Sequence, residues 1–241
     1  MYIAEACGNT FAVMFDDRGQ AQERLQDWRQ SETWTFDSAL VLHSTTGASV
    51  AMSIHERDGS VSAMCGNGLR ALGAILDDLG LPRSVRVDSG VLHVERSRNG
   101  AYQTPIRPAV PGGILRPSIG PEGGYTLYEV EGEPHAVAVV DQADHVPLAR
   151  WARHVVPLAN CTILSRVSHN TIRARTFERG VNRETPSCGT GACAAATAAV
   201  RELGFTARRI QVSMTHFVLT VNLTPDAMVL EGSVNIFGRK S

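Results

Sequence analysis

Two cysteines in this 241-residue chain have closely matching surroundings. The sequence Met64-Cys65-Gly66-Asn67-Gly68 begins one predicted helix, and Ser187-Cys188-Gly189-Thr190-Gly191 begins another. A cysteine at the first turn of a helix is favoured as the thiolate, because the helix dipole is positive at that end. The glycines let the backbone approach a ligand, and the free N–H groups of the first turn can bind a carboxylate.

Two such turns aimed at one small molecule would bind its carboxylate and place one sulfur on each face of the adjacent carbon. One thiolate could then remove a proton while the other sulfur, as a thiol, returns a proton from the opposite face. This inverts a stereocentre, and the two helix ends would stabilise the charge that develops on the carboxylate. A single Cys-Gly turn is more often a tight helix start around a small buried residue. Two echoing turns favour the catalytic interpretation.

The elements around the cysteines repeat, as gene duplication would produce. Apolar residues at helical spacing predict helices over 66–79 and 190–203, each followed by a glycine suited to a helix C-terminus. The segment 105–124 is rich in proline and glycine and has no periodicity, so it is a predicted domain boundary. Predicted strands cover 11–15, 38–43, 50–55, 85–88, 90–95, 125–130, 135–140, 163–168, 171–176, 210–214, 217–223 and 229–237.

Composition narrows the function classes. With 43% hydrophobic residues, 20% charged residues and a formal charge of −1, the chain is expected to bind neither nucleic acid nor a membrane. No apolar run reaches the roughly 18 residues of a membrane span, and the N-terminus lacks the features of a secretion signal, so a cytoplasmic location is the default expectation. Five cysteines are too few for a disulfide scaffold, and Cys188 and Cys193 lack a histidine at zinc-finger spacing.

Several motifs together resemble a known family. The first set consists of Asp58-Gly59-Ser60, the Cys65 motif and Arg70. The second consists of Phe177-Glu178-Arg179-Gly180, Glu184-Thr185 and the Cys188 motif. Three further motifs accompany them: Gly8-Asn9, Glu133-Pro134-His135 and Asn160. Their order and spacing are similar to those of the diaminopimelate epimerase-like family of two-cysteine amino-acid racemases and epimerases. The resemblance covers nearly the whole chain.

The resemblance implies an α+β fold of two pseudo-symmetric α/β domains, each a barrel-like sheet around a central helix. The active site would lie in the cleft between them. The N-terminal domain would comprise residues 1–108 plus about 228–241, because the last strand returns to it, and the C-terminal domain 109–227. The implied reaction uses no cofactor: no pyridoxal phosphate, metal or nucleotide. The partner is expected to be an amino-acid substrate, and a homodimer is left open.

The same resemblance implies roles for individual residues. Cys65 and Cys188 correspond to the two acid/base groups. The remaining site residues fall into three groups: a carboxylate cradle around Gly66, Asn67, Gly189 and Thr190; a set around the reacting amino group or supporting the cysteines, Asn9, His135 and Glu178; and a set for the far end of the substrate, Asn160 and Arg179.

Two departures from the family bear on the substrate. Glu56 and Glu133 stand where the family has amides, and Ser38 stands where it usually has glutamine. A second carboxylate on the substrate would be repelled there, whereas a cationic side chain would be attracted. The predicted substrate is therefore a basic amino acid such as histidine, or lysine, ornithine or arginine. In the alternative, the glutamates neutralise Arg179 or face solvent, and LL-/meso-diaminopimelate is the substrate.

Two other function classes stay open at this stage. A two-thiol redox protein would use the same cysteines, but the chain has no C-x-x-C spacing. A catalytically inactive amino-acid-binding protein could be built on the same fold. The presence of both thiols favours an enzyme over either. Cys7, Cys161 and Cys193 are interpreted as packing residues.

Overall fold

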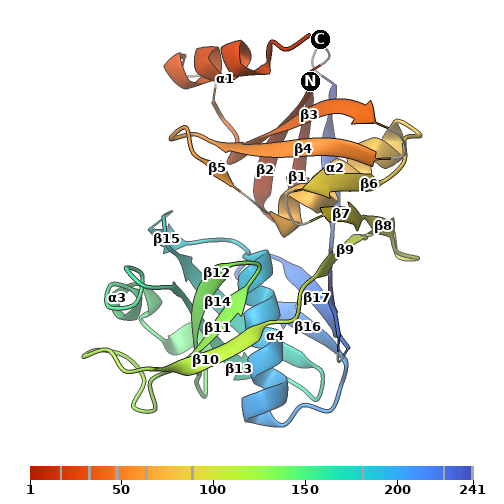
Figure 1. The fold of residues 1–241 in the computed structure, drawn as a ribbon. Coiled ribbons are helices and arrows are strands. Elements are labelled where there is room, and N and C mark those ends of the chain that lie inside the picture. Colours follow the sequence, from red (N-terminus) through yellow and green to blue (C-terminus); the bar gives the residue numbers. More distant parts are fainter. Residues whose placement is uncertain are drawn as a thin grey trace. The chain divides into compact units, whose positions relative to one another are not determined.

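The computed structural model divides the chain into two compact units, Met1–Pro105 with Gly232–Ser241 and Ile106–Glu231 (Figure 1). It describes residues 1–16, 18–31, 34–46, 49–62, 65–87, 90–180, 182–224 and 226–239. The two units divide at 105/106 and 231/232, where the sequence led us to expect 108/109 and about 227/228. The second boundary moves because strand β18 (Met228–Gly232) pairs with β17 before the chain returns to the first unit.

The first unit is a mixed sheet with the strand order β19-β1-β2-β3-β4-β6-β7. Its long helix α2 (Gly66–Asp78) packs on one face, and the short helix α1 (Ala21–Gln30) packs on the other. Its strands are β1 (Tyr2–Ala6), β2 (Asn9–Phe15), β3 (Ser38–Thr46), β4 (Ser49–Glu56), β5 (Val61–Ser62), β6 (Ser84–Val87), β7 (Gly90–His93) and β19 (Val234–Arg239). The paired strands β8 (Glu95–Arg96) and β9 (Tyr102–Ile106) follow β7.

Side chains on β3 show how the two faces are filled. Leu40 and Leu42 belong to the core under α2, whereas Ala39 and Val41 belong to the cluster under α1. This is the period-two alternation of a strand buried on both faces. The helical periodicity of 66–79 also follows from burial. The apolar residues that repeat at helical spacing, Leu69, Leu72, Ile75 and Leu76, are all fully buried.

The second unit repeats this scheme. Its strand order β10-β11-β12-β13-β14-β16-β17-β18 carries helix α4 (Gly189–Leu203) on one face, while η1 (Ala143–His145) and α3 (Leu148–Ala152) join the core that includes Tyr125 and Ile163. Its other strands are β10 (Val110–Leu115), β11 (Tyr125–Val130), β12 (Glu133–Val139), β13 (Asn160–Arg166), β14 (Thr171–Glu178), β15 (Arg183–Glu184), β16 (Arg209–Ser213) and β17 (Val218–Leu223).

The two sheets share one topology. In the first unit β2 pairs parallel with β3 and β4 pairs parallel with β6; in the second, β12 pairs parallel with β13 and β14 with β16. The two-residue strands β5 and β15 pair with β4 and β14, and the long helices α2 and α4 are the next elements along the chain. The predicted fold class, two similar α/β units, is confirmed.

Several predicted elements need correction. Strands β1, β5, β9, β10 and β15 and helices α1 and α3 were not predicted, and β10 lies inside the segment 105–124 that was interpreted as a domain boundary. The predicted strand 229–237 is two strands, broken at Ser233, that belong to different units. As expected, the last strand returns to the first unit, where β19 pairs with β1. Met64 and Asp88 lie outside the described residues. No helix among the described residues is long and apolar enough to cross a membrane.

Candidate active site

Cys65 is the N-cap residue of α2. Its backbone is extended (φ −143°, ψ 108°), and its Sγ accepts a hydrogen bond from the backbone N–H of Gly68 at 3.3 Å. A cap residue with non-helical backbone whose side chain accepts from the third helical residue is the standard solution for a helix N-terminus. The sulfur therefore lies at the positive end of the helix dipole, where the thiolate is favoured.

Asn67, Asn9 and Arg70 form a hydrogen-bonded chain beside Cys65. The Asn67 Nδ2 donates to Oδ1 of Asn9, and Nη2 of Arg70 donates to Oδ1 of Asn67 at 2.5 Å. Asn67 and Arg70 are buried, and Asn9 is half-buried. The structure thus brings together the predicted residues Asn9, Asn67 and Cys65 in the first unit, and adds Arg70.

Cys188 caps α4 with nearly the same geometry. Its backbone angles are φ −137° and ψ 116°, and its Sγ accepts from the N–H of Gly191 at 3.4 Å. A Cβ atom on Gly191 would lie 2.6 Å from Oγ1 of Thr176, so a larger residue would displace the turn. Oγ1 of Thr190 lies 3.6 Å from the sulfur. Each unit therefore contributes one cysteine at a helix start, as the two motifs predict.

His135 is a fully buried neutral imidazole in the second unit. Its Nε2 lies 3.0 Å from Oγ1 of Thr190, and its Nδ1 lies 3.3 Å from Oγ1 of Thr162. Burial and, to a lesser extent, the charge of Arg179 lower the pKa of His135 to about 3. The imidazole is therefore neutral at physiological pH, and it can hold the Thr190 hydroxyl next to Cys188.

Glu178 ends strand β14 and contacts Cys188. Burial raises the pKa of Glu178 above its ordinary value, while hydrogen bonds from Thr185 and Cys188 and the positive charge of Arg183 oppose that rise. Next to it, Oδ1 of Asn160 accepts from the backbone N–H of Arg179 at 2.8 Å. Its amide nitrogen lies 3.5 Å from Nε2 of His135. The strand register brings Asn160 and His135 together, because the two residues are paired across β12 and β13.

Glu56 and Glu133 are held in different ways. The Glu56 carboxylate accepts from the hydroxyls of Ser38 at 2.9 Å and Ser62 at 2.7 Å. Glu133 forms an ion pair with Arg179 at 3.4 Å, with the side chains 50% and 43% exposed. The alternative that a glutamate pairs with Arg179 thus holds for Glu133. Within the described part of the chain, no basic side chain forms an ion pair with Glu56.

The sequence reasoning missed three residues. Arg70 and Thr185 both stand in the quoted motifs but were given no role, and Ser62 was not singled out. Arg70 carries the clearest signal, because an arginine at a core-facing helical position is rare unless its charge is used. The hydroxyl contacts of Thr185 and Ser62 depend on the strands β15 and β5. Each of these strands is only two residues long, so it shows no alternating pattern in the sequence.

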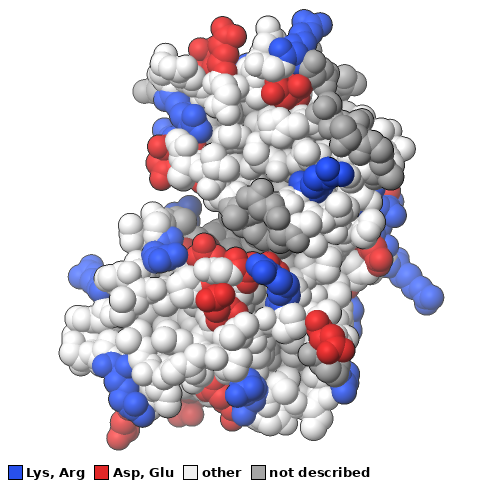
Figure 2. All heavy atoms as spheres, in the orientation of Figure 1, with Lys and Arg blue, Asp and Glu red and all other residues white. Residues whose placement is uncertain are grey.

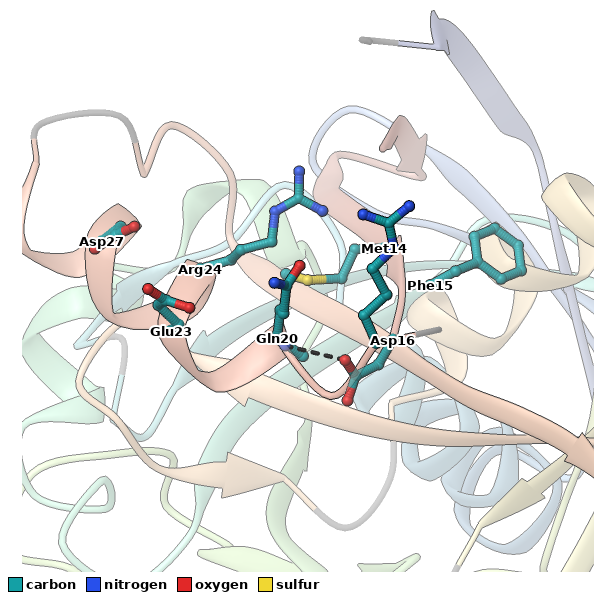
Figure 3. A pocket seen from close by; sticks show the side chains of 9 residues that line it. Met14, Phe15, Asp16, Gln20, Glu23, Arg24 and Asp27 are labelled. Atoms are coloured by element: carbon teal, nitrogen blue, oxygen red, sulfur yellow. Dashed lines mark hydrogen bonds between the residues drawn. The ribbon is translucent and has the colours of Figure 1, made fainter.

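A groove beside α1 in the first unit is separate from the predicted site. It has a volume of about 410 Å³ and is lined by Met14, Asp16, Gln20, Glu23 and Arg24 among others, beside α1 (Figure 3). None of the predicted site residues lines it. Lysine and arginine side chains are scattered over the visible face of the protein (Figure 2). This distribution agrees with the near-neutral charge of −1.

Comparisons with known proteins identify the family. The family model described as "Diaminopimelate epimerase" matches residues 128–237. A diaminopimelate epimerase of Archaeoglobus fulgidus is 32% identical over 219 residues, 83% of this chain and 78% of the relative. One of Methanocella arvoryzae is 34% identical over 218 residues, 81% of this chain and 77% of the relative.

Solved structures agree on the fold. A phenazine biosynthesis PhzC/PhzF protein from Clostridium difficile superposes with a TM-score of 0.77 at 15% identity, covering 100% of this chain and 97% of that one. The paired Cys-Gly turns, the duplicated topology and the sequence relationship lead to one conclusion. The chain belongs to the diaminopimelate epimerase family and is a cofactor-independent amino-acid racemase or epimerase.

Proposed function

We propose that this protein inverts the α-carbon of a basic amino acid by a two-base mechanism in which Cys65 and Cys188 are the acid/base groups. The observation that carries the mechanism is the equivalence of the two helix starts. Both sulfurs accept from the third residue of their helix, at 3.3 and 3.4 Å. Both are thus favoured as thiolates, and both stand beside N–H groups that can bind a carboxylate.

In the proposed reaction, the thiolate of one cysteine takes the α-proton and becomes a thiol. The electron pair of the broken C–H bond is delocalised into the substrate carboxylate, whose charge the first-turn N–H groups around Gly66, Asn67, Gly189 and Thr190 stabilise. The thiol of the other cysteine then delivers its proton to the opposite face and becomes a thiolate. The reverse direction exchanges the two roles, so the cycle needs no external oxidant or cofactor.

The surrounding polar groups receive supporting roles. The Glu178 carboxylate is proposed to bind the substrate's ammonium group, and the amide N–H groups of Asn9 are proposed to bind its carboxylate. His135, neutral because of its burial, is proposed to hold Thr190 in place through the 3.0 Å contact. A neutral imidazole adds no positive charge that would compete for the substrate carboxylate.

The proposal for the substrate rests on Glu56. Its two carboxylate oxygens each accept one hydrogen bond from a neutral serine hydroxyl and have lone pairs left for a cation. Glu133 and Arg179 largely cancel one another. A carboxylate without an ion-pair partner among the described residues favours a cationic side chain, since a charge-assisted hydrogen bond contributes about 1.5–3 kcal/mol. Histidine is the first choice, followed by lysine, ornithine and arginine.

Diaminopimelate is the second candidate. Arg179 offers a partner for a distal carboxylate, and the exposed ion pair that holds it is worth only about 0.2–1 kcal/mol, so a substrate could break it. The relatives from Archaeoglobus fulgidus and Methanocella arvoryzae carry the name diaminopimelate epimerase.

A substrate panel separates the two candidates. We would measure kcat/KM for racemisation of histidine, lysine, ornithine, arginine and diaminopimelate with the wild type, Glu56→Gln and Glu133→Gln. The proposal predicts a basic amino acid as the best substrate and a loss of about tenfold or more in Glu56→Gln. Diaminopimelate as the best substrate, or an unchanged Glu56→Gln variant, would overturn the substrate assignment and leave the two-cysteine mechanism standing.

A further inference from the structure

In the second unit, the carboxylate that contacts Cys188 belongs to Glu178, and it accepts a hydrogen bond from a threonine hydroxyl. The Thr185 Oγ1 donates a hydrogen bond to Oε1 of Glu178, and Thr185 is only 4% exposed. Its backbone N–H donates to the carbonyl of Thr176 at 3.2 Å. The backbone of Thr185 is therefore held against β14, and the hydrogen bond to Glu178 orients its hydroxyl.

An ion pair anchors the segment that carries this threonine. The carboxylate of Glu184, the residue before Thr185, accepts two hydrogen bonds from Arg175, at 2.8 and 2.6 Å. Arg175 also donates to the carbonyl oxygens of Ala143 and Val146, at 2.8 and 3.0 Å. A forked pair with both partners largely buried holds a fixed geometry. The strand β15 is thereby held against β14.

The turn between the two strands brings Glu178 and Thr185 together. The N–H of Asn182 donates to the carbonyl of Glu178 at 2.9 Å, and Glu178 is paired with Arg183 across β14 and β15. Asn182 has a positive φ of 55°, which the tight turn requires. The Glu178 carboxylate is thus in contact with both the Thr185 hydroxyl and the Cys188 side chain.

We infer that Thr185 is a positioning residue that orients the Glu178 carboxylate against Cys188 through the hydrogen bond from its hydroxyl. This inference rests on the proposed function, because it assigns the oriented carboxylate to the reaction at Cys188. The Glu178 carboxylate accepts hydrogen bonds from Thr185 and Cys188, and the charges of Arg183 and Glu133 act on its pKa in opposite directions. Burial favours its protonated form, and the Thr185 hydroxyl is one of the donors that favour the carboxylate.

The consequence of removing the hydroxyl has a definite sign. A donor to a carboxylate stabilises the ionised form and lowers the pKa, so its loss raises the pKa of Glu178 further above the ordinary value. We expect a rise of about one pH unit in Thr185→Val. Activity should then fall about tenfold at the acidic end of the pH range while changing much less above pH 8.

The test measures the carboxyl directly and the reaction separately. Protein labelled with ¹³C at the glutamate side-chain carboxyl would be titrated by NMR, with Glu178→Gln to assign the signal. Thr185→Val should show the raised pKa, and Thr185→Ser, which keeps the hydroxyl, should restore it. Thr104→Val is the matched control, because Thr104 is also fully buried and its hydroxyl has no hydrogen-bond partner among the described residues. If Thr185→Val does not fold, Thr185→Ala, which also lacks the hydroxyl, would be compared with Thr185→Ser in its place.

The same variants would then be assayed for exchange of the α-proton in heavy water across pH 5–9, on the amino acid that the wild type exchanges fastest. An unchanged Glu178 titration in Thr185→Val, or a loss of activity that is equal at every pH, would overturn the inference. Wild-type protein that exchanges no α-proton would instead overturn the proposed function, while the titration result would still stand.

Discussion

The guanidinium of Arg70 is completely buried and donates from Nη2 to Oδ1 of Asn67 at 2.5 Å. This contact decides which way the Asn67 amide points. With its oxygen held by Arg70, Asn67 turns its Nδ2 toward Oδ1 of Asn9. Asn9 is then left with its own amide N–H groups as donors on the half-buried side of the first unit.

The first prediction follows from this chain. Arg70→Met should lower the free energy of unfolding by about 1.5–3 kcal/mol, because a hydrogen bond to a buried charge is lost and Asn67 loses its partner. It should also lower kcat/KM, since the Asn67 and Asn9 amides are no longer oriented. Arg70→Lys keeps the charge and should lose less of both. Arg24→Met on the exposed side of α1 is the control. Urea unfolding and kinetics check the outcome, and an Arg70→Met variant as stable and active as the control would contradict it.

A second prediction concerns the order in which the thiols react. Cys65 is half-exposed at a helix N-terminus, whereas burial raises the pKa of Cys161 to about 12. Iodoacetamide at pH 7.5 should therefore modify Cys65 first, then Cys188, which is 5% exposed, and leave Cys161 unmodified in the folded protein. Peptide mass mapping over time measures this order. Modification of Cys161 as fast as Cys65 would show that helix position and burial do not set thiol reactivity here.

Stability should depend on pH through His135. Its folded pKa of about 3 lies below the unfolded value of about 6.5, so below pH 6.5 the unfolded chain binds a proton that the folded chain does not. The free energy of unfolding should consequently fall as pH decreases from about 6.5 toward 3, by up to roughly 1.4 kcal/mol per pH unit from this group.

Urea unfolding of the wild type and His135→Gln at pH 7, 6, 5 and 4 tests this dependence. The difference in free energy between the two proteins should shrink as the pH is lowered, because glutamine does not titrate. A constant difference over that range would mean that His135 is protonated in the folded state or does not contribute. His154→Gln, an exposed histidine, is the matched control.

The sequence allowed the two helices and their caps to be predicted, for a local physical reason. The Cys-Gly-x-Gly turns, the spacing of Leu69, Leu72 and Ile75, and the Gly204 C-cap all act within one or two helical turns. The duplicated sheet also follows from the repeated motifs, because each copy must bury the same helix face.

Other features depend on contacts between distant segments and could not be predicted from local pattern. Strand β10 contains Pro111, Gly112 and Gly113, which resemble a loop, but it pairs with β11 at the sheet edge where a missing N–H is tolerated. Helix α1 buries only Ala21 and Leu25, so its apolar stripe is too short for a clear periodic signal. The sequence left the pairing of Glu133 with Arg179 as one of two alternatives, and the fold decides it. The contacts of Glu56 with two serines are likewise set by the fold.

The most direct test of the two-cysteine mechanism is racemisation by the single variants Cys65→Ala and Cys188→Ala, with Cys193→Ala as a control for a buried thiol on α4. Optical rotation of the preferred substrate would be followed from each enantiomer. The mechanism predicts that each single variant loses racemisation by a factor of about 10²–10⁴ or more, because neither thiol can serve the face of the other. Cys193→Ala should remain active. A Cys65→Ala or Cys188→Ala variant that racemises at close to the wild-type rate would contradict the mechanism.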